Sequence, residues 1–379
     1  MCTFLDITGV FDNVSWTPLL SQLGKIGASL NTTRMTESYL KNRFAQLTLK
    51  KAKHEKKMER GCPQGSQLGP TLWKVAMSEL LALPQEPNIK VIAYADDIAL
   101  LVGAAKHDTV VARTEKYLDK IKSWASTYNL SFSPTKTQVM SIKGGVKPGY
   151  EVGFGTDVAG PRITADGTVK YFGVILDPRE GYWGHVESLT EKSKSLYSRL
   201  RNLASANWGI SQLTSRTTYK GVFLPRVTYA SEIWAEGAKL KKSIKKLGSI
   251  QRPPLLAMTA AYRTSSTNCL SVVAGVLPLD LEVEKSVLQK QLKRGGITQD
   301  QFKDHESIIF AKWQERYETT DKGEWTKTMI PSVRERYKLP MPLDHYTTQL
   351  LTGHGNFKSK LFKFKLVASP NWVPRHLVR

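Results

Sequence analysis

The stretch AYADDIALLV, residues 93–102, decides the fold of the N-terminal half of the chain. Apolar runs rich in β-forming residues, 89–93 and 98–102, flank the acidic pair Asp96 and Asp97. This pattern predicts a β-hairpin that carries both carboxylates at its turn. Paired Asp residues also occur in hairpin turns because they suit the turn itself, so the pair alone does not define a site.

A second strand is predicted at Cys2–Ile7, which is rich in β-formers. Because a core strand needs neighbours and nothing precedes this one, we expect part of its domain to lie upstream of Met1. Asp6 ends the strand. One interpretation of Asp6 is a cap for a following helix. The other is that Asp6 meets Asp96 and Asp97 at one edge of an antiparallel sheet.

Three carboxylates at one sheet edge suit a particular chemistry. Phosphoryl transfer onto a 3′-hydroxyl uses two divalent ions roughly 3.5–4 Å apart, one at the attacking oxygen and one at the leaving group. Magnesium prefers oxygen ligands and keeps several waters, so a few aspartates can hold both ions. If the two strands are neighbours in one antiparallel sheet, Asp6, Asp96 and Asp97 converge on one point, where two Mg²⁺ ions would fit.

The rest of the chain divides into an α/β part and a helical part. Up to about residue 180 we expect helices at 19–30, 34–42, 71–83 and 108–128, a basic hairpin within 45–60, and strands at 137–142 and 168–176. From Val186 the pattern is mostly helical. Proline is expected to break the helices at Pro225, Pro253 and Pro254, Pro278 and Pro331.

Composition favours a nucleic-acid partner. The 379 residues include 55 Lys and Arg against 33 Asp and Glu, a formal net charge of +22. Such a surface releases counterions when it binds phosphates. No basic amphipathic segment points to a membrane surface, and no signal peptide or spanning segment is visible. Three widely spaced Cys residues indicate neither a disulfide framework nor a zinc site.

Five motifs of the N-terminal half resemble the ordered palm motifs of reverse transcriptases. They are FLDITGVFDNV (4–14), GCPQGSQLGP (61–70), AYADDIALLV (93–102), NLSFSPTKTQVM (129–140) and VKYFGVIL (169–176). The resemblance implies an α+β right-hand palm followed by a helical thumb. It also implies that Asp6 and Asp96 are metal ligands, with Asp97 adjacent to them.

The resemblance assigns further residues to the incoming nucleotide. Phe11 falls where the family places an aromatic ring that leaves no room for a 2′-hydroxyl. Without the family it would be a core Phe at the start of a helix. Gln64, Gly65 and Ser66, after Pro63, match the loop beside nucleotide and template. By themselves they form an ordinary Gly/Pro turn.

Two more assignments follow from the same resemblance. Lys136 matches the lysine near the leaving pyrophosphate, where an ammonium can donate a proton or neutralise charge. Its plain alternative is a solvated surface lysine. Tyr171, Phe172 and Gly173 resemble the hairpin that grips the primer end, and core packing is compatible with that role.

The C-terminal half narrows the resemblance to non-LTR (LINE-type) retrotransposons, Jockey-like or inserting into ribosomal DNA. The segments that carry it are 213–234, 250–281 and 345–357. It implies an RNA-directed DNA polymerase with an RNA template, a DNA primer, deoxynucleoside triphosphates, Mg²⁺ and a nuclear location. A retroviral enzyme or an intron maturase is disfavoured.

The chain also departs from that family. The upstream fingers and the endonuclease expected in the parent polyprotein are not present, and Trp372 stands where the first Cys of a terminal Cys/His cluster is expected. The chain is therefore a fragment or a decayed copy, and the isolated chain is expected to be inactive or nearly so. A non-catalytic nucleic-acid-binding remnant is the alternative function.

These expectations give three regions: an incomplete palm at 1–180, a thumb-like helical region at 181–262 and a helical C-terminal extension at 263–379. For two groups of residues the sequence leaves two alternative roles open. The first can contact template phosphates or form a solvated face, and comprises Lys50, Lys51, Lys53, Lys56 and Lys57. The second can stack on bases or anchor the core, and comprises Trp208, Trp234, Trp313 and Trp325.

Overall fold

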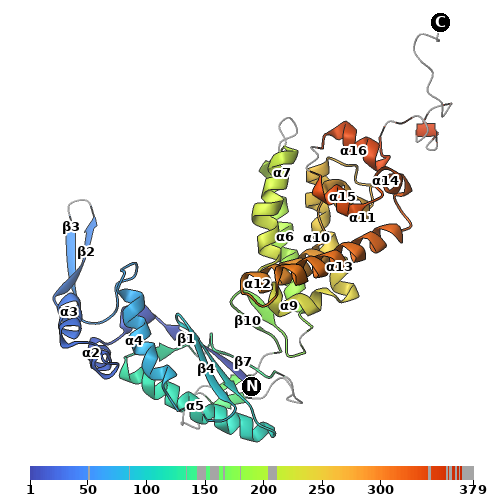
Figure 1. Cartoon of the computed structure of the whole chain (residues 1–379). Coiled ribbons are helices and arrows are strands. Elements are labelled where there is room, and N and C mark those ends of the chain that lie inside the picture. The colour runs from blue at the N-terminus through green and yellow to red at the C-terminus, as the bar shows by residue number, and fades with distance from the viewer. Residues whose placement is uncertain are drawn as a thin grey trace. The chain divides into compact units, whose positions relative to one another are not determined.

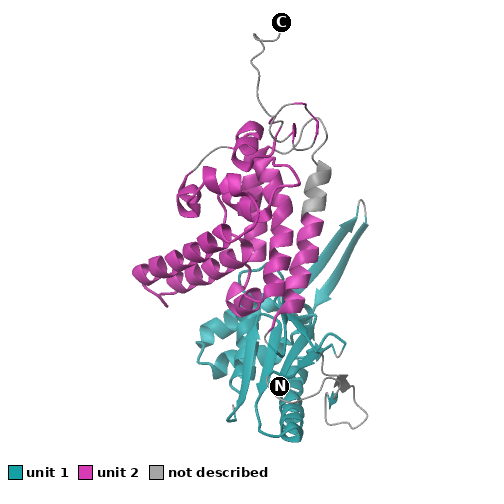
Figure 2. Cartoon of the chain, turned by 90° about the vertical axis from the view of Figure 1, so that its right-hand side faces the viewer, with its two compact units in different colours: residues 1–179 teal, residues 180–379 magenta. Residues whose placement is uncertain are grey.

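The computed structural model divides into two compact units, residues 1–179 and 180–379 (Figure 2). It describes residues 1–49, 52–84, 86–133, 135–142, 151–153, 162–164, 167–179, 181–203, 211–339, 343–355, 357, 361–362, 365–366 and 368. No helix among these residues is long and apolar enough to cross a membrane. The further division expected near residue 262 stays a prediction.

Unit 1 is built on an antiparallel sheet with strand order β4-β5-β1-β6, in which β7 also pairs with β1. The bounds are β1 (Cys2–Thr8), β4 (Ile89–Tyr94), β5 (Asp97–Val102), β6 (Ser131–Phe132) and β7 (Gln138–Met140). The strand beginning at Cys2 and the hairpin around Asp96 were both predicted. The central strand β1 is buried along most of its length, which fits its apolar residues.

Helices cover the sheet and share its core (Figure 1). They are α1 (Val10–Asn13), α2 (Trp16–Lys25), α3 (Leu30–Leu40), α4 (Gly69–Leu81) and α5 (His107–Thr127). The four predicted helices correspond to α2 to α5, with shifts of up to five residues at their ends. The N-cap of α1 is Gly9 and no side chain caps it, so the interpretation of Asp6 as a helix cap is wrong.

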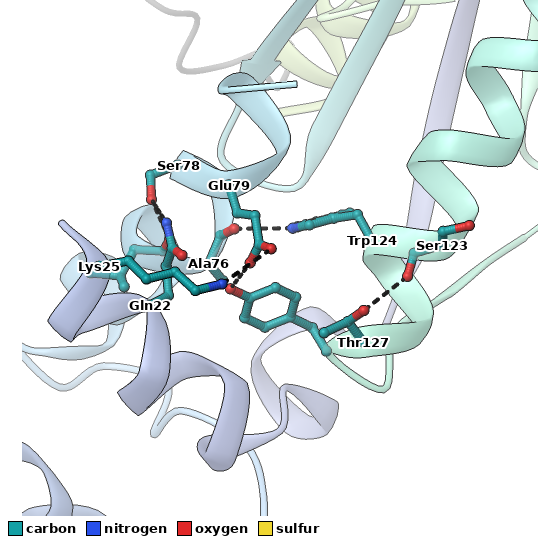
Figure 3. A network of polar contacts seen from close by, with 10 residues as sticks. Gln22, Lys25, Ala76, Ser78, Glu79, Ser123, Trp124 and Thr127 are labelled. Carbon is teal, nitrogen blue, oxygen red and sulfur yellow. Dashed lines mark hydrogen bonds and ion pairs between the residues drawn. The ribbon is translucent and has the colours of Figure 1, made fainter. Parts of the chain in front are cut away.

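Polar contacts lock α4 between α2 and α5, as Figure 3 shows. The Gln22 amide of α2 donates to the Ser78 hydroxyl at 3.1 Å, and the Trp124 indole of α5 donates to the Ala76 carbonyl at 3.1 Å. Because Trp124 is buried, this hydrogen bond fixes the rotation of α4 beneath the sheet.

Among its described residues, unit 1 also contains three two-stranded antiparallel sheets: β2 (Arg43–Leu49) with β3 (Ala52–Met58), β8 (Glu151–Gly153) with β9 (Arg162–Thr164), and β10 (Val169–Tyr171) with β11 (Val174–Leu176). The first is the predicted basic hairpin, and Lys53, Lys56 and Lys57 on β3 are exposed. Lys50 and Lys51 lie outside the described residues. The single strand expected over 168–176 is wrong, since the chain reverses at Phe172 and Gly173.

Unit 2 is helical. Its elements are α6 (Trp183–Leu203), α7 (Gln212–Thr218), the π-helix η1 (Tyr219–Phe223), α8 (Leu224–Val227), α9 (Ser231–Ala238), α10 (Lys241–Thr259), α11 (Thr267–Ala274), α12 (Leu279–Lys293), α13 (Gln299–Glu318), α14 (Glu324–Met329), α15 (Val333–Lys338) and α16 (His345–Thr352). The predicted break at Pro253 and Pro254 is wrong, because both lie inside α10. Packing of α10 against α6, α11 and α12 holds the helix together across the two missing N–H groups.

Two of the tryptophans singled out in unit 2 lie in its core. Trp234 and Trp313 are fully buried and anchor two separate apolar clusters. Trp325 is half exposed and its indole donates to the Leu350 carbonyl at 2.6 Å. Trp208 lies outside the described residues. Core packing is therefore the observed role of Trp234 and Trp313.

Candidate active site

Strand register brings the three acidic residues to one edge of the sheet. Asp6 on β1 lies directly opposite Asp97 on β5, and cross-strand partners project to the same face. Tyr94 pairs with Asp97 across the β4–β5 hairpin, which leaves Ala95 and Asp96 as its two-residue turn. Ala95 has a φ of 53°, the left-handed value that tight hairpin turns require at this position.

The negative charges of the acidic group repel one another. The pKa of Asp97 is raised by burial, and further by the charges of Asp96 and Asp6. Burial also raises the pKa of the Tyr171 hydroxyl to about 12, with added contributions from the charges of Asp97 and Cys2. A divalent cation would relieve this mutual repulsion, and oxygen is its preferred ligand.

The carboxylates are close in register but do not form a finished metal cage. Among the described residues, no three acidic, His or Cys side chains are arranged so that they could hold one ion. Asp6 instead has a cationic neighbour, since its Oδ2 lies 3.4 Å from the Nζ of Lys136. The Asp6 carbonyl accepts from the Ser133 N–H at 3.0 Å, which ties the Lys136 loop to the end of β1. Lys136 is thus in contact with the acidic group, not simply solvated.

Trp73 positions the turn, a role that no sequence motif assigns to it. The side chain is 4% exposed, and its indole N–H donates to the Ala95 carbonyl at 2.7 Å. Trp73 also lies beside Phe11, with ring centroids 6.4 Å apart. The sequence feature that could have indicated this role is the position of Trp73 in the helix that directly follows the GCPQGSQLGP loop.

The loop after Gly61 packs against the helix that carries Phe11. The Cys62 N–H donates to the Phe11 carbonyl at 2.5 Å, and the Gly61 N–H donates to the Val14 carbonyl at 2.8 Å. Gly61 has a φ of 89°, and a Cβ there would lie 2.8 Å from the carbonyl oxygens of Phe11 and Asp12. Only glycine fits this approach.

The three loop residues singled out from the sequence differ in their surroundings. The Ser66 hydroxyl donates to the Pro63 carbonyl and accepts from the Gly69 N–H, each at 2.9 Å, so Ser66 shapes the loop. Gly65 has a φ of 80° and open space around it. Gln64 lines a cavity of about 420 Å³ together with Phe11, Asp12, Trp16, Arg43, Phe44, Ala45, Met58, Arg60, Gly61, Cys62 and Pro63.

Aromatic contacts hold the β10–β11 hairpin on the acidic edge. Its two turn residues, Phe172 and Gly173, both have positive φ, 44° and 79°. The Phe172 ring meets Tyr94 edge-on with centroids 5.2 Å apart, and Tyr171 packs on Phe4 with centroids 4.5 Å apart. The hairpin therefore lies directly beside the residue that precedes the Ala95–Asp96 turn.

Comparisons with known proteins identify the family to which the chain belongs. The family model "Reverse transcriptase (RNA-dependent DNA polymerase)" matches residues 1–176. A "Retrovirus-related Pol polyprotein from type-1 retrotransposable element R1 4" of Nasonia vitripennis is 30% identical over 307 residues, which cover 72% of this chain and 77% of the relative. The chain belongs to the reverse transcriptases of non-LTR retrotransposons. All eleven of the proposed site residues lie within the matched range.

The chain spans about a third of the length of two further relatives that it matches. The "Putative 115 kDa protein in type-1 retrotransposable element R1DM" of Drosophila melanogaster is 30% identical over 95% of this chain, which spans 36% of the relative. An "RNA-directed DNA polymerase from mobile element jockey" of Drosophila funebris is 26% identical over 70% of this chain and 29% of the relative. A solved telomerase from Candida albicans is 14% identical with a TM-score of 0.33, over 85% of this chain and 51% of that one.

Proposed function

We propose that this chain forms the catalytic palm and the following helical part of an RNA-directed DNA polymerase. It adds deoxynucleotides to a DNA 3′-end on an RNA template, in the nucleus, as part of a parent polyprotein that also carries an endonuclease. The observation that carries the proposal is the register that sets Asp6 opposite Asp97, next to Asp96. Unit 1 supplies the palm, and the first helices of unit 2 supply the thumb.

Asp6, Asp96 and Asp97 would hold two Mg²⁺ ions. The all-oxygen donor set and the raised pKa of Asp97 support this fit. When bound, such ions lower the pKa of the attacking 3′-hydroxyl and neutralise charge on the leaving pyrophosphate. Lys136, 3.4 Å from Asp6, adds an ammonium that can donate a proton to the pyrophosphate.

Nucleotide and primer recognition are assigned to the residues around this edge. The Phe11 ring excludes a 2′-hydroxyl, and the Gln64 amide in the same cavity hydrogen-bonds a base or sugar edge. Gly65 allows the backbone to approach the nucleotide, and Ser66 keeps the loop in shape. The turn of β10 and β11 holds the primer end beside Tyr94.

Metal removal tests the function directly. The full-length parent, with its upstream and downstream regions, should extend a DNA primer on an RNA template in Mg²⁺. Chelation by EDTA should reduce extension to background, and added Mg²⁺ should restore it, because the proposed carboxylates act only through bound cations. Extension that persists in EDTA, or a parent that cannot use RNA as template, would refute the proposal.

The net charge of +22 supports a second candidate function, non-catalytic binding of nucleic acid. Triphosphate positioning supplies much of the rate of phosphoryl transfer, so residues 1–379 alone should bind nucleic acid with little extension. Robust extension by residues 1–379 would eliminate this candidate.

Replacing Trp73 by Phe should slow extension by the parent by roughly 10- to 100-fold, since loss of the indole N–H frees the Ala95–Asp96 turn and small misplacements are costly. Stability should fall by only about 1 kcal/mol. Steady-state extension and urea unfolding measure the two effects. Trp234→Phe is the matched control, because this buried Trp of unit 2 also loses one indole hydrogen bond, to the Tyr229 carbonyl, and does not contact Trp73. An equal slowing by both variants would show that Trp73 has no special effect on the turn.

A further inference from the structure

The helix that carries Phe11 is too short to hold its own position. α1 has four residues, Val10–Asn13, and its N-cap Gly9 provides no side-chain hydrogen bond. The N–H groups of Asp12 and Asn13 both donate to the Gly9 carbonyl, at 3.1 and 3.0 Å. A single helical turn is unstable alone, because fixing its backbone costs more conformational entropy than its hydrogen bonds offset. The position of α1 therefore depends on tertiary contacts.

The loop at Gly61 and Cys62 supplies such contacts at the C-terminal end of α1. The last carbonyls of a helix have no partners within the helix itself. Here the Cys62 N–H donates to the Phe11 carbonyl at 2.5 Å, and the Gly61 N–H donates at 2.8 Å to the carbonyl of Val14, the residue that follows α1. Cys62 is 3% exposed, so its hydrogen bond is shielded from water and strengthened by the low local dielectric. This loop thus fixes the backbone of Phe11.

Trp16 ties the same loop to the start of α2. Its indole N–H donates to the Gly61 carbonyl at 2.8 Å, so both backbone groups of Gly61 are hydrogen-bonded. The Trp16 side chain is half-buried and packs against the core of unit 1. The preceding residue, Ser15, donates its N–H at 2.9 Å to the carbonyl of the fully buried Tyr128. Trp16 therefore connects the loop to a rigid part of the molecule.

The Phe11 side chain and these anchoring residues line one cavity. Phe11 is half-buried, and it shares the cavity of about 420 Å³ with Trp16, Gly61 and Cys62. The contact with Trp73, at 6.4 Å between ring centroids, supports the ring but does not fix the backbone beneath it. A shift of α1 would consequently move the Phe11 ring within the cavity.

We propose that Trp16 is a positioning residue for the selection of deoxynucleotides. Its hydrogen bond to the Gly61 carbonyl keeps the loop against α1, and this keeps the Phe11 ring where a 2′-hydroxyl would collide with it. The proposal deepens the proposed function, on which it rests for the role of Phe11. Trp16 acts through the loop and α1, so its loss affects the choice between sugars more than extension itself.

The test replaces Trp16 by Phe in the full-length parent, which keeps an aromatic ring and removes the N–H donor. Addition of one nucleotide opposite a template G gives kcat/KM for dCTP and for CTP. The ratio of the two values should fall about 10-fold, because a loosened Phe11 ring yields to the extra hydroxyl. The value for dCTP should change less than about three-fold, since the metal-binding edge is untouched.

Two further variants control this experiment. Trp325→Phe removes one indole hydrogen bond of unit 2, to the Leu350 carbonyl, and should leave the ratio unchanged. Trp16→His keeps an N–H at the ring position of the indole N–H and loses the fused benzene ring, so it should discriminate better than Trp16→Phe. If Trp16→His and Trp16→Phe discriminate equally poorly, the hydrogen bond is not the cause and the proposal is overturned.

Hydrogen exchange tests the mechanism without any activity. In residues 1–379, Trp16→Phe should speed exchange of the Cys62 amide by roughly 3- to 10-fold, because the loop opens more often. The amides of β5 should stay protected, which shows that the fold is intact. A Cys62 amide as well protected as in the unsubstituted chain overturns the proposal. So does a variant parent that loses activity on both nucleotides while the ratio stays the same.

Phe11→Ala separates the failure of this proposal from the failure of the proposed function. This variant removes the ring itself and should lower the ratio about 100-fold. If Phe11→Ala lowers the ratio and Trp16→Phe does not, the role of Trp16 falls and that of Phe11 stands. If neither variant lowers it while the parent still extends primers, the assignment of Phe11 to the sugar falls as well.

Discussion

Replacing Asp96 by Asn in the full-length parent is expected to lower RNA-templated primer extension at least ~10³-fold, since loss of a metal-binding carboxylate removes several kcal/mol of charge stabilisation in the transition state. The affinity of the parent for an RNA–DNA hybrid duplex should not change. The free energy of unfolding of the variant should equal or slightly exceed that of the unsubstituted parent, because Asp96 is exposed and its charge repels that of Asp97. Single-turnover extension and thermal unfolding provide the measurements.

The control for this experiment is Asp108→Asn, which makes the same chemical change at an exposed carboxylate in the first turn of α5. Asp108→Asn should leave extension within about two-fold of the unsubstituted parent, since it costs only a weak helix-terminus interaction. If Asp96→Asn extends primers at more than about a tenth of the normal rate, the assignment of the acidic edge as the metal site is wrong.

Gly61→Ala is expected to destabilise unit 1 by roughly 3–5 kcal/mol, because a Cβ costs about 1–2 kcal/mol at this φ and also meets two carbonyl oxygens. The loop must move away from α1, which breaks the contact between Cys62 and Phe11. Thermal unfolding of residues 1–379 and hydrogen exchange at the Cys62 amide measure these two consequences.

Gly65→Ala separates the cost of the positive φ from the cost of the close approach to α1. Gly65 has a similar φ of 80°, but a Cβ there would have no described atom within 4 Å, so its replacement should cost only about 1–2 kcal/mol. The Cys62 amide should stay protected in this variant. Equal destabilisation by the two substitutions would mean that the close approach of Gly61 to α1 contributes nothing.

The acidic edge could be predicted from sequence because two strong local patterns meet there. Apolar runs define β1, β4 and β5, and a two-residue turn between the last two forces Asp96 and Asp97 toward the end of the sheet. The contact of Lys136 with Asp6 depends on a loop that crosses to β1, and no local pattern reports it. The metal geometry and the roles of the site residues stay predictions.

Other features could not be predicted from the sequence because they depend on tertiary contacts. Phe172 turns the chain at a φ of 44°, a rare conformation for an aromatic residue, so the segment reads as one continuous strand. Pro253 and Pro254 normally end a helix, yet neighbouring helices keep α10 intact. Trp73 has the pattern of a core residue, and only the fold shows that its N–H reaches Ala95.

The opposition of Asp6 and Asp97 has a consequence for how copies of such a gene decay. Side chains alternate between the two faces of a strand, so a shift of β1 against β5 by one residue would send Asp6 to the opposite face. Loss of one codon between Cys2 and Asp6 would preserve the reading frame but change this register. A deletion of three nucleotides there is therefore expected to separate Asp6 from Asp97 without a frameshift.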